Sequence, residues 1–153
     1  MQDYQAYYAD KTVLITGGST GLGRSLGQYL VSLGARLAIC GRRQDVLDKA
    51  VAEMSAGGAQ VLAVPCDVRQ HDQVEAMVDT VRERFGRIDA LVNNAAGNFI
   101  CPTERLSYNA FDAVVDIVLK GTYNCTLAIG KQWIAEQTPG AVLNISTTYA
   151  WTG

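Results

Sequence analysis

A glycine-rich turn near the amino terminus is the part of the sequence that points most directly to chemistry. Residues 12–23 read T-V-L-I-T-G-G-S-T-G-L-G, so a short apolar and β-branched run leads straight into a cluster of glycines. Apolar residues then recur at helical spacing, with Leu22, Leu26, Tyr29, Leu30 and Leu33 on one side. Glycines let the main chain approach a ligand, and the free N–H groups of a first helical turn attract negative charge. This order of elements predicts a pyrophosphate site.

The spacing of these glycines is G-x-x-x-G-x-G, which assigns the turn to Gly17, Gly21 and Gly23. A glycine cluster alone is weak evidence, but the strand-to-helix setting favours nucleotide binding. The cofactor contacts expected in this segment are Gly17, Gly18, Ser19, Thr20, Gly21, Leu22 and Gly23.

A pair of arginines follows the next apolar run and bears on which dinucleotide is bound. The run ends at Cys40 and leads into Gly41-Arg42-Arg43, with no acidic residue where an NAD-binding protein places one on the ribose hydroxyls. A guanidinium can hold a 2′-phosphate through two hydrogen bonds, whereas a carboxylate would repel it. We therefore predict NADP(H), with Arg42 as the contact. The alternative is that both arginines are solvated loop residues.

Two later strand ends could face the same ligand. Asp67 and Val68 follow the third apolar run, and Asp67 could accept a hydrogen bond from an adenine amino group or cap the following helix. The fourth run leads into N-N-A-A-G-N, where small residues and amides suit a flat ligand at Asn94, Ala95 and Gly97. Asparagine side chains also stabilise tight turns, but three of them within six residues favour a site.

A tyrosine follows the fifth apolar run in N-I-S-T-T-Y, at Tyr149. A hydroxyl-rich strand end in the same crevice can polarise a substrate carbonyl. The other interpretation is a strand end rich in β-branched residues with an interfacial tyrosine.

Alternating strands and helices must position these residues. The pattern predicts strands at 12–16, 36–40, 60–64, 88–92 and 141–146, and helices at 21–33, 44–55, 70–85 and about 108–136. Right-handed crossovers between parallel strands give an α/β fold, a doubly wound Rossmann sheet of order 3-2-1-4-5 that stops after strand 5. Ligands bind such sheets beyond the carboxyl ends of the strands, at the switch point between strands 1 and 4.

Two helices have apolar stripes that the pattern assigns to the core. The stripe of the helix at 70–85 is Val74, Met77, Val78, Val81 and Phe85. The stripe of the last helix is Phe111, Val114, Val115, Val118, Cys125 and Ile129.

Length and composition narrow the function further. The 153 residues fit a single domain, 1–153, and the net charge of −2 argues against a nucleic-acid or membrane partner. Four scattered cysteines and the single His71 match no metal-binding pattern, so we expect no metal and read all four cysteines as small buried residues. The absence of a targeting pattern or a membrane-spanning run makes a reducing, cytoplasmic location the expectation.

Together these motifs resemble the short-chain dehydrogenase/reductase family over nearly the whole chain. T-G-G-S-T-G-L-G is similar to its cofactor loop, C-D-V to its adenine contact and N-N-A-A-G to its N-N-A-G segment. Two positions depart from the usual pattern. Val118 stands where members carry Asn in N-L-x-G, and Thr147 matches the usual catalytic serine.

Both departures resemble the 2,4-dienoyl-CoA reductase branch, whose A-A-G-N-F-x-x-P-T-E-R-L-S signature matches residues 95–107. The resemblance implies NADPH-dependent reduction of 2,4-dienoyl-CoA thioesters to 3-enoyl-CoA in the β-oxidation of unsaturated fatty acids. It implies that Asn98 and Tyr149 hydrogen-bond the thioester carbonyl oxygen. The positions that match acyl-CoA contacts are Arg42, Arg69, Phe99 and Ser107. Another NADP-dependent short-chain reductase, such as one for 3-oxoacyl thioesters, and a non-catalytic dinucleotide-binding fragment are the alternatives.

In the family, a lysine that holds the nicotinamide ribose and the segments that close over the substrate come later than residue 153. We therefore expect little catalysis from these residues alone. For the full-length protein the resemblance implies a homo-oligomer, a dimer or a tetramer.

Overall fold

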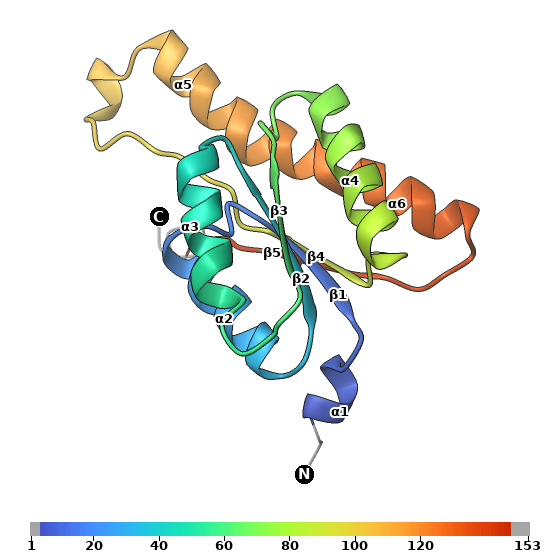
Figure 1. Ribbon diagram of the computed structural model, residues 1–153. Helices are drawn as coiled ribbons and strands as arrows, with labels where there is room; N and C mark the ends of the chain where they lie inside the picture. The colour runs from blue at the N-terminus through green and yellow to red at the C-terminus, as the bar shows by residue number, and fades with distance from the viewer. Residues whose placement is uncertain (1–3, 148–153) are drawn as a thin grey trace.

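A five-stranded sheet organises the chain, and a computed structural model describes residues 4–147 of it (Figure 1). The strands are β1 (Thr12–Thr16), β2 (Arg36–Gly41), β3 (Val61–Pro65), β4 (Ala90–Asn93) and β5 (Ala141–Asn144). All neighbouring strands are parallel, and their order is β3-β2-β1-β4-β5. The predicted doubly wound fold and strand order are therefore confirmed.

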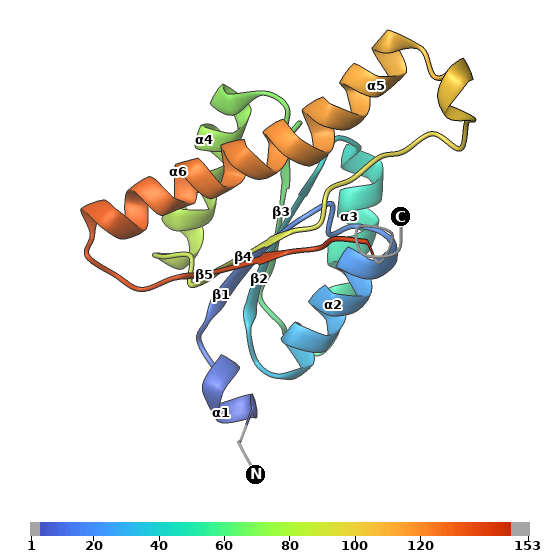
Figure 2. The ribbon, with the colours of Figure 1, turned by 180° about the vertical axis from the view of Figure 1, so that it is seen from behind.

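Helices cover both faces of this sheet (Figures 1 and 2). Helices α2 (Gly21–Ser32) and α3 (Gln44–Met54) lie on one face, and α4 (His71–Phe85) and α6 (Gly121–Ala135) lie on the other. Helix α5 (Tyr108–Val115) joins α6 through a π-helical segment, Asp116–Lys120, and a short 3₁₀ turn, Thr103–Arg105, precedes it. Helix α1 (Tyr4–Tyr8), which the sequence analysis does not predict, precedes β1.

Two apolar cores lie on the two faces of the sheet. Val13 and Ile15 of β1 pack with α2 and α3, whereas Leu14 packs with α4 and α6, because successive side chains of a strand point to opposite faces. The predicted stripe of α4 is confirmed, since each of its members is buried. β1 is buried at all five positions, as expected of the central strand of a parallel sheet.

The apolar side that helical spacing indicates for α2 is buried only in part. Leu22 and Tyr29 are 61% and 59% exposed, and the residues that α2 buries are Gly23, Gly27 and Leu30. A Cβ atom on Gly27 would lie 2.9 Å from Leu37 Cδ2 of β2. The helix therefore lies too close to the sheet for large side chains at its first turns, and its glycines form the contact.

The predicted stripe of the last helix is also wrong in part. Only Cys125 and Ile129 are buried, whereas Phe111 and Val118 are 57% and 42% exposed. The reason is the length of the helical rod, because α5 extends beyond the sheet while α6 packs against it (Figures 1 and 2).

Candidate functional site

The turn after β1 has a backbone conformation that favours glycine. Gly17 and Gly21 have φ angles of 64° and 54°, in the left-handed region that side chains disfavour. A Cβ atom on Gly18 would lie 2.5 Å from Ile39 Cγ2, so this glycine lets the turn rest on β2. No acidic residue stands in the first turn of α2, and no side chain caps it. The first helical N–H groups are thus available to an anion.

Asn94 holds this turn in place from β4. Its Nδ2 donates to the carbonyl oxygens of Thr16 and Gly17 at 3.0 and 3.2 Å. The hydroxyl of Thr16 accepts in turn from the backbone N–H groups of Asn94 and Ala95, at 3.0 and 2.9 Å. The amide of Asn94 thus joins two strand ends across the switch point instead of bonding its own turn. Thr16 is a residue that the sequence analysis missed.

A cavity of about 340 Å³ opens at the carboxyl ends of β1 to β4, where ligands of α/β sheets bind. The predicted cofactor residues that line it are Gly17, Ser19, Thr20, Arg42, Asp67, Val68, Asn94 and Ala95. Its remaining lining residues are Cys40, Gly41, Arg43, Cys66, Ala96 and Ile117, for which the sequence analysis predicts no contact.

The other predicted cofactor residues do not line this cavity. Gly18 and Gly23 are buried beneath the turn, whereas Gly21 and Leu22 lie exposed at the start of α2. Gly97 faces Ile117, whose Cδ1 would be 3.3 Å from a Cβ atom on that glycine.

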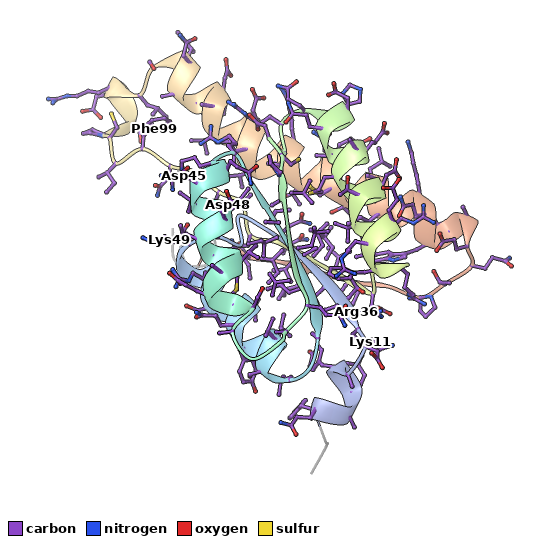
Figure 3. The ribbon with its side chains drawn as sticks, in the orientation of Figure 1. Lys11, Arg36, Asp45, Asp48, Lys49 and Phe99 are labelled. Atoms are coloured by element: carbon purple, nitrogen blue, oxygen red, sulfur yellow. The ribbon has the colours of Figure 1, made fainter. Side chains whose placement is uncertain are left out.

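A larger hollow of about 570 Å³ lies at the opposite end of the sheet, around Arg36, Gly57 and Gly58. Figure 3 shows Arg36 and Lys11 at that amino end of the strands and Asp45, at the start of α3, at the other. The smaller cavity is the candidate site, because only it combines strand carboxyl ends with the glycine turn.

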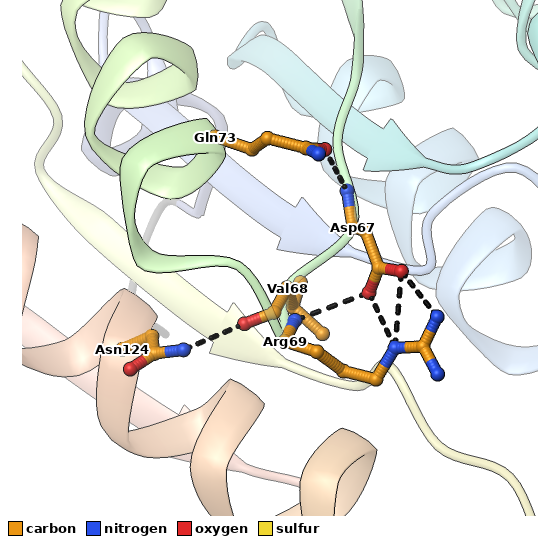
Figure 4. A network of polar contacts seen from close by, with 5 residues as sticks. All are labelled: Asp67, Val68, Arg69, Gln73 and Asn124. Carbon is orange, nitrogen blue, oxygen red and sulfur yellow. Dashed lines mark hydrogen bonds and ion pairs between the residues drawn. The ribbon is translucent and has the colours of Figure 1, made fainter. Parts of the chain in front are cut away.

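Asp67 and Arg69 form an ion pair at the rim of the cavity (Figure 4). Arg69 Nε donates to both carboxylate oxygens at 2.9 and 3.0 Å, and Nη2 lies 2.5 Å from Oδ2. The Arg69 guanidinium therefore lowers the pKa of the Asp67 carboxyl. The helix-capping alternative for Asp67 is wrong, because the residue before α4 is Gln70 and no side chain caps that helix. Since Asp67 is the only carboxylate among the described residues of the cavity lining, Arg42 and Arg43 leave the wall with positive charge.

The cysteines differ in their surroundings. Cys40 and Cys66 are buried side by side in the cavity wall, and their mutual hydrogen bond lowers the pKa of the Cys66 thiol and, with burial, raises that of Cys40. Burial raises the pKa of Cys125 to about 12. Cys101 is exposed, so the expectation that all four are buried is wrong for it. Within residues 4–147, no group of His, Cys, Asp or Glu could hold a metal ion.

Asn98, Phe99 and Ser107 line a separate cavity of about 550 Å³. All three residues are exposed on the segment between β4 and α5, and the Ser107 hydroxyl caps α5 by accepting from Ala110 N at 3.2 Å. Phe99 lies away from the sheet (Figure 3). Tyr149 falls outside the described residues.

The remaining two predicted acyl-CoA contacts lie elsewhere. Arg42 lines the 340 Å³ cavity, and Arg69 lines a different cavity of about 410 Å³ between α4 and α6. The structure thus brings three of the predicted substrate-side residues together and leaves Arg42 and Arg69 apart from them.

The family model for short-chain dehydrogenases matches residues 11–153, and the chain belongs to that family. Members of the family use nicotinamide dinucleotides as redox cofactors. The candidate site fits such a group in two respects. Side chains in place of the glycines would fill the turn, and the cavity wall beside the turn is positively charged.

Particular relatives carry dienoyl-CoA reductase names. A Bacillus subtilis protein named probable 2,4-dienoyl-CoA reductase, (2E)-enoyl-CoA-producing, is 41% identical and covers 92% of this chain and 56% of its own length. The peroxisomal 2,4-dienoyl-CoA reductase of Danio rerio, (3E)-enoyl-CoA-producing, is 37% identical over 95% of this chain and 48% of its own. The chain thus spans about half the length of the curated relatives it matches.

The fold is also similar to solved structures. A short-chain dehydrogenase from Bacillus anthracis superposes with a TM-score of 0.90 at 46% identity, covering 93% of this chain and 59% of that one. Levodione reductase has a TM-score of 0.83 at 37% identity over 90% of this chain and 54% of its own.

Proposed function

We propose that this chain forms the cofactor-binding part of an NADPH-dependent 2,4-dienoyl-CoA reductase that acts in the β-oxidation of unsaturated fatty acids. The observation that carries the proposal is the 340 Å³ cavity, in which the glycine turn and Arg42 line the same wall. The match of residues 95–107 to the branch signature and the names of several relatives support the substrate.

The choice of NADPH over NADH follows from charge. Arg42 follows β2 directly, and the only carboxylate among the described lining residues, Asp67, is neutralised by Arg69. A ribose 2′-phosphate would therefore meet Arg42 without a competing negative charge, and a charge-assisted hydrogen bond contributes about 1.5–3 kcal/mol.

On the substrate side, reduced dinucleotide would supply the hydride. Asn98 and Tyr149 would donate hydrogen bonds to the thioester carbonyl oxygen, where negative charge develops as the conjugated system is reduced, and fixed donors there lower the barrier. Phe99 and Ser107 would line the acyl-CoA path, and Arg42 and Arg69 would face its phosphates. The hydride would go to the δ-carbon of the dienoyl thioester, and uptake of a proton at the α-carbon of the resulting dienolate would give the expected product, a 3-enoyl-CoA.

The complete protein is proposed to be a homo-oligomer that binds neither nucleic acid nor membrane. No helix within the described range is long and apolar enough to cross a bilayer. The complete protein is proposed to lie in the cytoplasm or in an organelle, since four relatives are named as peroxisomal enzymes.

The test is a spectrophotometric assay of the intact protein with a 2,4-dienoyl-CoA and either NADPH or NADH. We expect loss of dienoyl absorbance that depends on NADPH. Reduction of a 3-oxoacyl thioester alone would assign the protein to another short-chain reductase. Tight NADPH binding without turnover of either substrate would leave a dinucleotide-binding module.

A further inference from the structure

Two thiols stand side by side in the wall of the 340 Å³ cavity, and the proposed reduction uses neither of them. Cys40 is next to the last residue of β2, and Cys66 directly follows the last residue of β3. Both line the cavity, although Cys40 is 0% and Cys66 3% exposed. A small molecule that enters the cavity can therefore reach sulfur atoms that are hidden from the rest of the surface.

The strand register places both thiols on the same face of the sheet. Cys40 pairs with Val64 across the parallel ladder, and Cys66 comes two residues after Val64. Because residues two apart along an extended chain point to the same face, Cys66 lies on the face of Val64 and hence of Cys40. Both cysteines belong to the apolar core that contains Leu14. The backbone N–H of Cys66 also donates to the carbonyl oxygen of Gly41 at 2.9 Å, which holds this end of the chain against β2.

The contact between the two thiols makes Cys66 the more reactive of the pair. The Cys40 thiol donates a hydrogen bond to the Cys66 sulfur, and this bond lowers the pKa of Cys66 although burial raises it. The pKa of Cys40 is raised by the same contact and by its own burial, so Cys40 keeps its proton. A thiolate is the form that attacks peroxides, and a neighbouring thiol can then resolve the oxidised sulfur.

We propose that hydrogen peroxide entering this cavity converts Cys40 and Cys66 into a disulfide and that this bond weakens dinucleotide binding. The Cys66 thiolate attacks one peroxide oxygen, the O–O bond breaks, and water leaves, so that Cys66 becomes a sulfenic acid. The Cys40 sulfur then attacks the Cys66 sulfur, the S–O bond breaks, and a second water leaves. Two electrons pass from the thiol pair to the peroxide, and the two thiol protons end in the two waters.

The disulfide would act on the cavity through the residues next to it. A disulfide holds its sulfurs about 2.05 Å apart, closer than any hydrogen-bonded contact, so its formation draws the chain after β3 toward β2. Arg42 comes two residues after Cys40, and Asp67 and Val68 directly follow Cys66; all three line the cavity. A shift of these residues lowers the affinity for the dinucleotide. Only this second effect rests on the proposed binding of NADP(H), since the disulfide itself needs no nucleotide.

Peptide mapping of the intact protein after treatment with hydrogen peroxide tests the disulfide. Trypsin releases Cys40 in the peptide 37–42 and Cys66 in the peptide 50–69. We expect these two peptides to be joined with the loss of two hydrogen atoms, and to be separated again by dithiothreitol. Absence of this cross-link in a sample in which the exposed Cys101 is oxidised would overturn the proposal.

Calorimetric titration with NADPH, after removal of the peroxide, tests the effect on binding. The Kd of the cross-linked protein should be about tenfold higher than that of the reduced protein and should return to its first value after dithiothreitol. Cys40→Ala and Cys66→Ala should each lose this response to peroxide. Cys125→Ala, the matched control at a buried thiol of the same core, should keep both the cross-link and the response.

An unchanged Kd in the cross-linked protein would contradict the proposal, and so would an equal rise in peroxide-treated Cys66→Ala. If a cysteine variant does not fold, the unchanged protein before and after peroxide and dithiothreitol gives the same decision. Failure of the reduced protein to bind any dinucleotide would instead reject the proposed function, and the peptide map would still decide whether the disulfide forms.

Discussion

The cofactor cavity and the segment between β4 and α5 are built in different ways. The cavity stands on buried strand ends that hydrogen bonds join, as Asn94 joins β4 to the turn after β1. Asn98, Phe99 and Ser107 are instead exposed on a connecting segment, and Phe99 is 57% exposed. The proposed dinucleotide site is thus formed by strand ends of the sheet, whereas the proposed substrate residues lie exposed on a connecting segment. Variants in the two regions should separate cofactor affinity from turnover.

The largest effect should come from the proposed substrate side. Tyr149→Phe in the intact protein should lower kcat about a hundredfold or more, because one donor to the developing oxyanion is lost, with NADPH affinity unchanged. Tyr108→Phe, at a tyrosine that is 90% exposed, is the matched control and should keep full activity. Normal turnover of Tyr149→Phe would remove this hydroxyl from the mechanism.

Asn98→Ala should act in the same direction, with a fall in kcat of about a hundredfold and an unchanged Kd for NADPH. Asn109→Ala, at an exposed residue in the first turn of α5, provides the comparison. A loss of NADPH binding in Asn98→Ala would contradict the separation of the two regions.

On the cofactor side, Gly23→Ala should be the most damaging change. The added Cβ would lie 2.5 Å from Asn94 Nδ2 and 2.7 Å from the Gly17 carbonyl oxygen, so the turn must shift. We expect about a hundredfold weaker NADPH binding and a loss of stability of about 1–3 kcal/mol, from calorimetry and denaturant unfolding. Gly130→Ala, where nothing lies within 4 Å of the new atom, should change neither; equal behaviour of the two variants would refute the close-packed turn.

Arg42→Ala should weaken NADPH about ten- to a hundredfold and NADH less than about twofold, because only NADPH carries the 2′-phosphate. Lys49→Ala removes an exposed positive charge from α3, outside the cavity, and should leave both affinities as they were. Equal weakening of both cofactors by Arg42→Ala would reject the phosphate contact.

The smallest expected effect is on the pH dependence of the unfolding free energy. Since Arg69 lowers the folded-state pKa of Asp67, the pair stabilises the fold above the ordinary aspartate pKa of about 3.9, and this is lost as pH falls through the folded-state value. Asp67→Asn should cost about 1 kcal/mol of unfolding free energy at neutral pH, a modest figure because Arg69 is 32% exposed, and the difference should shrink below about pH 4. Urea unfolding at several pH values measures it, and a difference independent of pH would contradict the ion pair.

Much of the cofactor side could be predicted from the sequence, because local patterns determine it. The order of strand, glycine turn and helix at residues 12–23 predicts both the fold and the turn, in which Gly17 and Gly21 have the positive φ angles that favour glycine. Distant contacts could not be predicted in this way. The bonds from Asn94 to Thr16 join residues 78 apart. The ion pair of Asp67 with Arg69 is local in the sequence, but it depends on the direction of the Arg69 side chain, which the residue pattern does not give.

The helices also differ from what local patterns predict. Helical spacing places Leu22 and Tyr29 on the apolar side of their helix, but α2 approaches β2 closely through its glycines, and these two side chains are exposed. Spacing also predicted one continuous helix at 108–136, whereas the π-helical segment brings Ile117 to the cavity. Both differences from the predicted helices result from tertiary packing, and the apolar pattern of one helix carries no information about how that helix packs in the whole fold.

The most direct test of the cofactor site is the change in backbone amide NMR shifts of the intact protein when NADPH is added. We expect the largest changes at Gly17, Arg42 and Val68, around the carboxyl ends of the strands. Changes confined to Arg36, Gly57 and Gly58, at the larger hollow at the opposite end of the sheet, would contradict it.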